Sequence, residues 1–148
     1  MSALLENAIT WHEISTEYFN KFIKNSEETR YLRACCYHMQ QTAEFSIKGT
    51  LELLGKEYSA GHDLEENGEQ LIAAINEAAQ ESMVFSPLKS IINDIQWLVD
   101  KSGIIIKWEQ KPRYDGENFF AKEENVRKCK ECLDNIISVV SEFINPVT

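Results

Sequence analysis

Arg33 and His38 are the two side chains whose types and spacing come nearest to an active site. An arginine can stabilise a phosphorane, and a histidine can take the proton of a ribose 2′-hydroxyl, so together they would supply the chemistry of a metal-free ribonuclease. On a helix, however, residues five positions apart are separated by roughly 140° after one full turn and do not share a face. The interpretation we favour makes His38 a packed or interface histidine and Arg33 a solvated helix residue.

The other two histidines have simpler explanations. His62 precedes Asp63, and a His–Asp pair could orient the imidazole ring for base or metal chemistry, but Asp63 is better explained as the N-cap of a helix. His12 lies beside Trp11 within a helical pattern, and we interpret it as structural.

The four cysteines form an adjacent pair, Cys35 and Cys36, and a CxxC pair, Cys129 and Cys132. A structural zinc site needs four well-placed ligands, and a redox CxxC needs a turn between a strand and a helix. Neither context is expected here, so we predict reduced, packed thiols and no metal or cofactor. A redox or zinc switch through Cys129 and Cys132 is the alternative.

The charge distribution restricts the classes of partner. The net charge of −9 argues against a general nucleic-acid binder, because affinity for phosphate backbones depends on basic patches. Residues 57–100 hold nine acidic side chains against one basic, whereas residues 101–130 hold eight basic against five acidic. Within that second interval, the stretch "KPRYD" could hold a phosphate or stack on a base through Arg113 and Tyr114. Equally, Arg113 could pair with an acid while Tyr114 covers the bundle end.

Apolar residues recur at helical spacing through most of the chain, and turn residues separate the repeats. We expect five helices, at residues 4–24, 28–54, 63–79, 86–102 and 121–144. Gly55 is expected to end the second helix and Asp63 to cap the third, while Ser86 and Pro87 would begin the fourth. The β-branched run and turn residues of 103–118 predict an extended segment and a loop. The fold class is therefore all-α, an up-and-down antiparallel helical bundle.

Length and composition agree with a folded chain. We expect a single domain over residues 1–148, because about 100 to 200 residues are typical of one core. Hydrophobic residues make up 43% of the chain and charged residues 26%, which excludes a disordered class. We see neither a signal-peptide pattern nor a membrane-spanning run, and we expect a cytoplasmic protein.

Three short stretches in order, "HMQQTAEFSIKGTLELLG", "HDL" and "RYD", followed by a terminal helix, resemble the small stand-alone HEPN domains of prokaryotes. This family is named for nucleotide binding in higher eukaryotes and prokaryotes. The resemblance covers about residues 31–140, and its strongest part is the pattern of Gln41, Ala43, Glu44, Ile47 and Lys48. It implies a helical bundle like that of nucleotidyltransferase substrate-binding subunits. It also implies homodimers, often paired with a minimal nucleotidyltransferase in systems of the toxin–antitoxin type.

Many members of that family are metal-independent ribonucleases with an R-x4–6-H motif near the last long helix. In this sequence the histidines at positions 12, 38 and 62 all precede Arg113, so that late motif is missing. Arg33 and His38 satisfy R-x4-H formally, but within the second helix, where the resemblance predicts packing. The sequence therefore resembles the subset without the nuclease motif, for which binding is the usual inference.

We therefore expect a non-catalytic homodimer that binds a protein partner, for which the resemblance suggests a nucleotidyltransferase, and a nucleotide or RNA. The residues expected at the binding site are Gln41, Glu44, Lys48, His62, Asp63, Arg113 and Tyr114. The alternative is a toxin-like, metal-independent ribonuclease that uses Arg33 and His38.

Overall fold

The computed structural model describes residues 3–61, 63–108 and 121–144. Across these residues the protein is built of helices, with no strand, so the predicted all-α bundle is confirmed. The α-helices are α1 (Ala3–Lys24), α2 (Thr29–Leu53), α3 (Leu64–Glu81), α4 (Ile92–Asp100), α5 (Ser102–Ile105) and α6 (Glu123–Ile144). Two 3₁₀ helices, η1 (Met83–Ile91) and η2 (Ile106–Trp108), flank α4 and α5.

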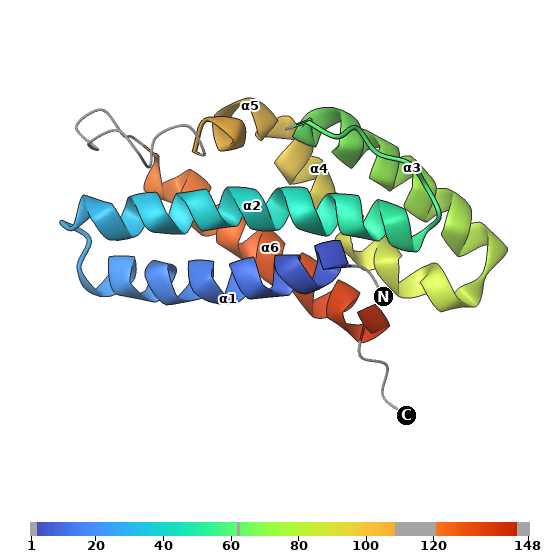
Figure 1. Ribbon diagram of the computed structural model, residues 1–148, viewed down its shortest axis with the longest axis horizontal. Helices are drawn as coiled ribbons and strands as arrows, with labels where there is room; N and C mark the ends of the chain where they lie inside the picture. The colour runs from blue at the N-terminus through green and yellow to red at the C-terminus, as the bar shows by residue number, and fades with distance from the viewer. Residues whose placement is uncertain (1–2, 62, 109–120, 145–148) are drawn as a thin grey trace.

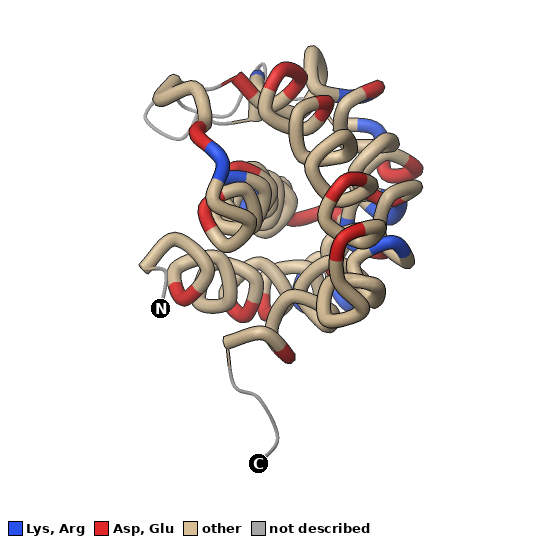
Figure 2. The backbone as a smooth tube through the Cα atoms, turned by 90° about the vertical axis from the view of Figure 1, so that its right-hand side faces the viewer, with Lys and Arg blue, Asp and Glu red and all other residues tan. Residues whose placement is uncertain are grey.

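The two long N-terminal helices form an antiparallel hairpin, and α6 crosses behind both of them (Figure 1). The view along the hairpin places α1 and α2 on one side of the molecule, opposite the layer that contains α6 (Figure 2). Acidic and basic residues are distributed over several helices in this view rather than gathered on one of them. No helix in the described part of the chain is long and apolar enough to span a membrane.

The core lies between the hairpin and the other helices, α6 together with α3, η1 and α4. Met39, Ala43 and Ile47 recur along α2 at a spacing of four and are almost completely buried. Helix α6 packs against α2 and carries a second apolar stripe. Its buried residues, among them Val126 and Leu133, also recur at helical spacing. The buried residues of α6 are Val126, Cys129, Cys132, Leu133, Ile136, Ile137, Val140 and Ile144. This confirms the helix expected at the end of the chain.

Two of the expected helix ends are confirmed in detail. Gly55 has φ +72°, a left-handed conformation that glycine adopts without penalty, and the Lys56 amide donates to the Leu51 carbonyl at 2.9 Å. At the start of α3, the Asp63 side chain accepts a hydrogen bond from the Glu66 amide at 3.4 Å. The intervening turn is thus fixed at both ends by local chemistry.

The expected start of the fourth helix at Ser86 is wrong. Ser82 is the N-cap instead, its hydroxyl accepting from the Val84 amide at 3.2 Å, and a 3₁₀ helix rather than an α-helix follows. Pro87 lies inside that 3₁₀ helix, and α4 begins only at Ile92. Proline has no amide hydrogen to donate, which a short 3₁₀ segment tolerates better than a helix interior.

The segment after Gly103 also differs from the expectation. Its β-branched run forms α5 and η2 instead of an extended strand. Ile105 and Trp108 become completely or almost completely buried in the core, and this burial outweighs the intrinsic strand preference of isoleucine. Residues 109–118, the rest of the predicted loop, lie outside the described residues.

Candidate functional site

Arg33 and His38 line the same surface pocket, near the start of α2. The pocket has a volume of about 360 Å³, and its other lining residues are Arg30, Ala34 and Tyr37. Positions 30, 33, 34 and 37 are neighbours on one helical face, and the ring of His38 extends the lining around the helix. Arg33 and His38 therefore line one pocket although they lie roughly 140° apart around the helix. Its volume lies at the lower end of small-molecule sites, roughly 300 to 1,000 Å³.

The imidazole ring of His38 is held in one orientation. Its Nδ1 lies 2.7 Å from the Ala34 carbonyl oxygen. A carbonyl oxygen only accepts, so Nδ1 is the donor, and in the neutral ring Nε2 carries the lone pair. The ring also contacts three aromatic side chains, with centroid distances of 5.2 Å to Trp11, 5.7 Å to Tyr18 and 5.2 Å to Tyr37.

Basic side chains lie at this end of the hairpin, together with the two carboxylates of residues 27 and 28. The Arg30 guanidinium lies 4.9 Å from the Tyr31 ring centroid, and its Nε lies 3.3 Å from Oε2 of Glu28. Lys21 on α1 lies 5.3 Å from the Tyr18 ring and 5.8 Å from the Tyr31 ring. The amides of the first turn of α2 also point toward this end and favour negative charge. The region can attract an anion.

The residues expected at the binding site fall into separate places. Gln41 and Glu44 are only 9% and 7% exposed, and Gln41 donates to the Gln40 side chain at 2.8 Å. Lys48 approaches the Ala60 carbonyl at 3.5 Å, beside the turn before α3, while Asp63 caps α3. None of these four lines the Arg33–His38 pocket. The expected residues His62, Arg113 and Tyr114 lie outside the described residues.

The cysteines are packed as free thiols. Burial raises the pKa of Cys35 and of Cys132 to about 12, and it raises the pKa of Cys36 and Cys129 well above the ordinary value. A thiol that stays protonated is a poor nucleophile and a poor metal ligand. Across the ranges that the structure describes, no group of three His, Cys, Asp or Glu side chains is placed to hold a metal ion.

Arg30 and Tyr37 are site residues that the sequence reasoning missed. The signal was present, because they lie three residues before and four after Arg33, the spacing of neighbours on one helical face. The contact of His12 was also missed: its Nε2 lies 2.7 Å from Oδ1 of Asp134 on α6. No local pattern could have shown that contact.

Comparison with known protein families gives a match for most of this chain. The HEPN domain family matches residues 9–143, which covers most of the hairpin, the pocket and almost all of α6. No curated protein and no solved structure matches the chain. The resemblance seen in the sequence is confirmed, and the chain belongs to the HEPN domain family.

Proposed function

We propose that this HEPN protein is a non-catalytic homodimeric module that binds the phosphate group of a nucleotide or of RNA, together with a protein partner. The observation that carries the proposal is the pocket in which Arg30, Arg33 and His38 meet at the basic end of the hairpin. The partner that the family resemblance suggests for this protein is a nucleotidyltransferase.

The lining chemistry suits a nucleotide. Guanidinium groups bind phosphate oxygens through two parallel hydrogen bonds, and the side chains of two arginines line this pocket, mostly through their carbon atoms. The half-buried ring of Tyr37 offers a flat surface on which a base can stack. Nε2 of His38 is the ring nitrogen left available for a hydroxyl of the ligand, because Nδ1 is engaged by Ala34.

The same lining supports binding more strongly than cleavage. RNA cleavage through the 2′-hydroxyl needs one group to remove a proton and another to protonate the leaving oxygen. Among the side-chain types at this pocket, imidazole is the one that exchanges protons readily near neutral pH, whereas guanidinium stays protonated. In one protomer, His38 would therefore have to act both as the base and as the acid, two roles that ribonucleases normally divide between two side chains.

Homodimerisation is the second part of the proposal. It rests on the family resemblance and on the half-buried aromatic side chains along the α1–α2 hairpin, where Trp11 stacks on Phe45 at 6.5 Å and contacts His38. Aromatic side chains are enriched at the cores of protein interfaces. Sedimentation should give a dimer whose dissociation depends on concentration, and Trp11→Ser should weaken it. A monomer at all concentrations would contradict this part.

Nucleotide binding can be tested by thermal or urea unfolding with AMP, ATP or a single-stranded oligoribonucleotide. A ligand at a hundred times its dissociation constant adds about 2.7 kcal/mol to the free energy of unfolding. Arg33→Gln should weaken binding by at least tenfold. Arg127→Gln is the matched control, because Arg127 is exposed on α6, pairs with Glu123 at 2.9 Å and does not line the pocket. Absence of stabilisation by all three ligands, or equal loss in both variants, would contradict the proposal.

A ribonuclease is the second candidate, and two observations favour it: Arg33 and His38 share a pocket, and Nε2 of His38 is oriented by the Ala34 contact. His38 would act as the base and Arg33 would stabilise the phosphorane. The wild type and His38→Ala should be incubated with structured and single-stranded RNA in excess chelator, with circular dichroism to check the fold. Cleavage by the wild type alone would make the protein an enzyme, and no cleavage by either would leave the binding module.

A further inference from the structure

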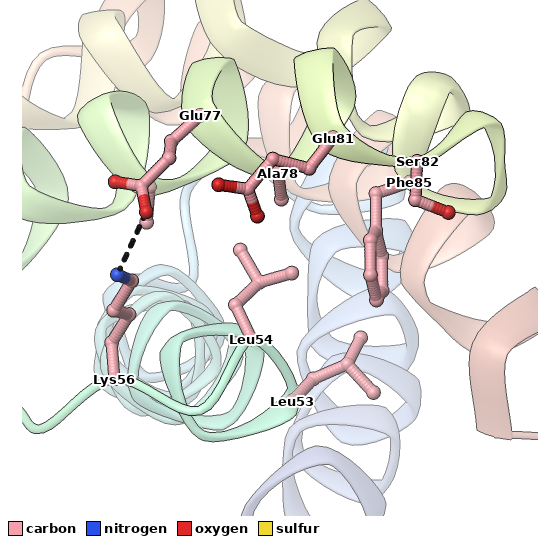
Figure 3. A pocket seen from close by; sticks show the side chains of 9 residues that line it. Leu53, Leu54, Lys56, Glu77, Ala78, Glu81, Ser82 and Phe85 are labelled. Atoms are coloured by element: carbon pink, nitrogen blue, oxygen red, sulfur yellow. Dashed lines mark hydrogen bonds and ion pairs between the residues drawn. The ribbon is translucent and has the colours of Figure 1, made fainter.

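A groove at the opposite end of α2 has a chemistry different from that of the Arg33–His38 pocket. Its volume is about 170 Å³, and its apolar wall is formed by Leu53, Leu54, Ala78 and Phe85. Two carboxylates, Glu77 and Glu81, complete it from α3 (Figure 3). Position 53 lies 15 residues beyond His38, or roughly 22 Å along the helix, so the two sites do not overlap.

The surface beside the groove is unusually apolar. Met83 is 86% exposed and Val84 is 66% exposed, and they directly follow Ser82, which lines the groove. The Ser82 cap fixes the backbone here, since its hydroxyl accepts from the Val84 amide. The next side chain, Phe85, turns inward and stacks on Phe143 with ring centroids 6.1 Å apart. Met83 and Val84 therefore offer exposed apolar surface beside the groove that a partner could cover.

The charge of the groove selects a cation. Glu77 and Glu81 lie one turn apart on α3, and Figure 3 shows the Glu81 carboxylate above Leu54 and the Glu77 carboxylate above Lys56. Lys56 lies 3.4 Å from Glu77, but both side chains are more than one-third exposed, so this ion pair is weak. One lysine against two carboxylates leaves the groove negative, and a phosphate would be repelled from it.

We propose that this groove receives an arginine side chain from a basic segment of a partner protein, while a neighbouring apolar residue of that segment covers Met83 and Val84. The aliphatic stem of arginine would pack on Leu53 and Leu54, and its guanidinium would bind Glu81 and stack on Phe85. A cavity of roughly 150 Å³ holds one benzene molecule, so the groove has room for a single side chain and not for a cofactor. The proposal does not depend on nucleotide binding.

The test uses the full-length protein labelled with nitrogen-15 and two short probe peptides at low salt. The first is acetyl-Leu-Arg-Ala-Leu-amide, and the second has glutamate in place of the arginine. The first peptide should cause saturable shifts of the amides of Leu54, Ala78 and Phe85. Glu81→Gln should raise its dissociation constant at least fivefold. Glu69→Gln is the matched control, because Glu69 is exposed on the same helix and does not line the groove.

The comparison of the two peptides distinguishes binding at a specific site from non-specific apolar binding. No saturation with the first peptide, equal binding of the second, or equal affinity of wild type and Glu81→Gln would each overturn the proposal. Met83→Ser combined with Val84→Ser should also weaken the first peptide without changing the fold, since both side chains are exposed. Sedimentation of that variant should match the wild type. A change in oligomeric state would assign the groove to a second copy of this chain and overturn the proposal as well.

Discussion

Nε2 of His12 lies 2.7 Å from Oδ1 of Asp134, and this contact joins α1 to α6 across 122 positions of the chain. Lys130, one turn earlier on α6, donates to the same carboxylate oxygen, and its ammonium lies 5.6 Å from the ring centroid of Phe19. The polar cluster of His12, Lys130 and Asp134 therefore closes one side of the interface between the hairpin and α6. None of the three lines the Arg33–His38 pocket, and the contact between α1 and α6 gives His12 a structural role.

Removing the imidazole of His12 should loosen this interface. We expect His12→Ala to lower the free energy of unfolding by about 1 kcal/mol, the usual contribution of one hydrogen bond. Thr10→Ala is the control, because Thr10 is exposed on α1 and its hydroxyl bonds only within its own helix, to the Glu6 carbonyl. Urea unfolding of both variants measures the difference. Equal stability of the two would show that the contact with Asp134 contributes nothing.

Gly68 permits the close approach of α3 to α4. A Cβ atom at this position would lie 2.4 Å from Cγ2 of Val99, a β-branched side chain with little rotamer freedom on a helix. We expect Gly68→Ala to destabilise the protein by about 1 to 3 kcal/mol, despite the better helix propensity of alanine. Gly103→Ala is the matched control, since a Cβ there meets nothing within 4 Å.

The Gly68 prediction can be separated from a general effect of alanine. The double variant Gly68→Ala with Val99→Ala should recover part of the lost stability, because the second change removes the atom that clashes. Thermal unfolding of the single and double variants measures this coupling. Gly68→Ala with stability at or above that of the wild type would show that α3 and α4 can move apart freely.

Gly55 tests a backbone effect rather than a packing effect. Its φ of +72° is unfavourable for residues with a Cβ, while a Cβ there would meet no atom within 4 Å. We expect Gly55→Ala to lower stability by about 1 kcal/mol through strain alone. Gly61→Ala has equal space and no positive φ, so it should be neutral or slightly stabilising. Similar unfolding midpoints for both variants would contradict this prediction.

The buried cysteines should make the protein less stable in alkaline solution. Burial raises the pKa of Cys35 to about 12, while in the unfolded chain the thiol ionises near 8.5. Above about pH 9 the unfolded state therefore binds fewer protons than the folded state, and stability falls as the pH rises toward 12. Urea unfolding between pH 8 and 10.5 should show this fall, with a shallower slope for Cys35→Ala. Identical slopes would mean that Cys35 ionises freely in the folded protein.

The sequence predicted the helices whose signals are local. The helices α1, α2 and α6, the Gly55 end and the Asp63 cap all depend on signals within a few turns, and each was found close to where it was expected. The start of η1 was misjudged because Ser82 and Ser86 both precede plausible helical residues, and only packing decides which serine acts as the cap. The run from Ile104 to Trp108 was misjudged because burial in the core overrides strand propensity.

By itself, the sequence determined the fold class, the family and the candidate pair Arg33 and His38, because periodicity and motif order are properties of the chain. Only the tertiary structure decided that His12 meets Asp134, because the two residues lie 122 positions apart in the chain. The same holds for the groove of Leu54, Glu81 and Phe85, which three separate elements build. Contacts between distant segments depend on how helices cross, and the crossing is set by the packing of the whole core.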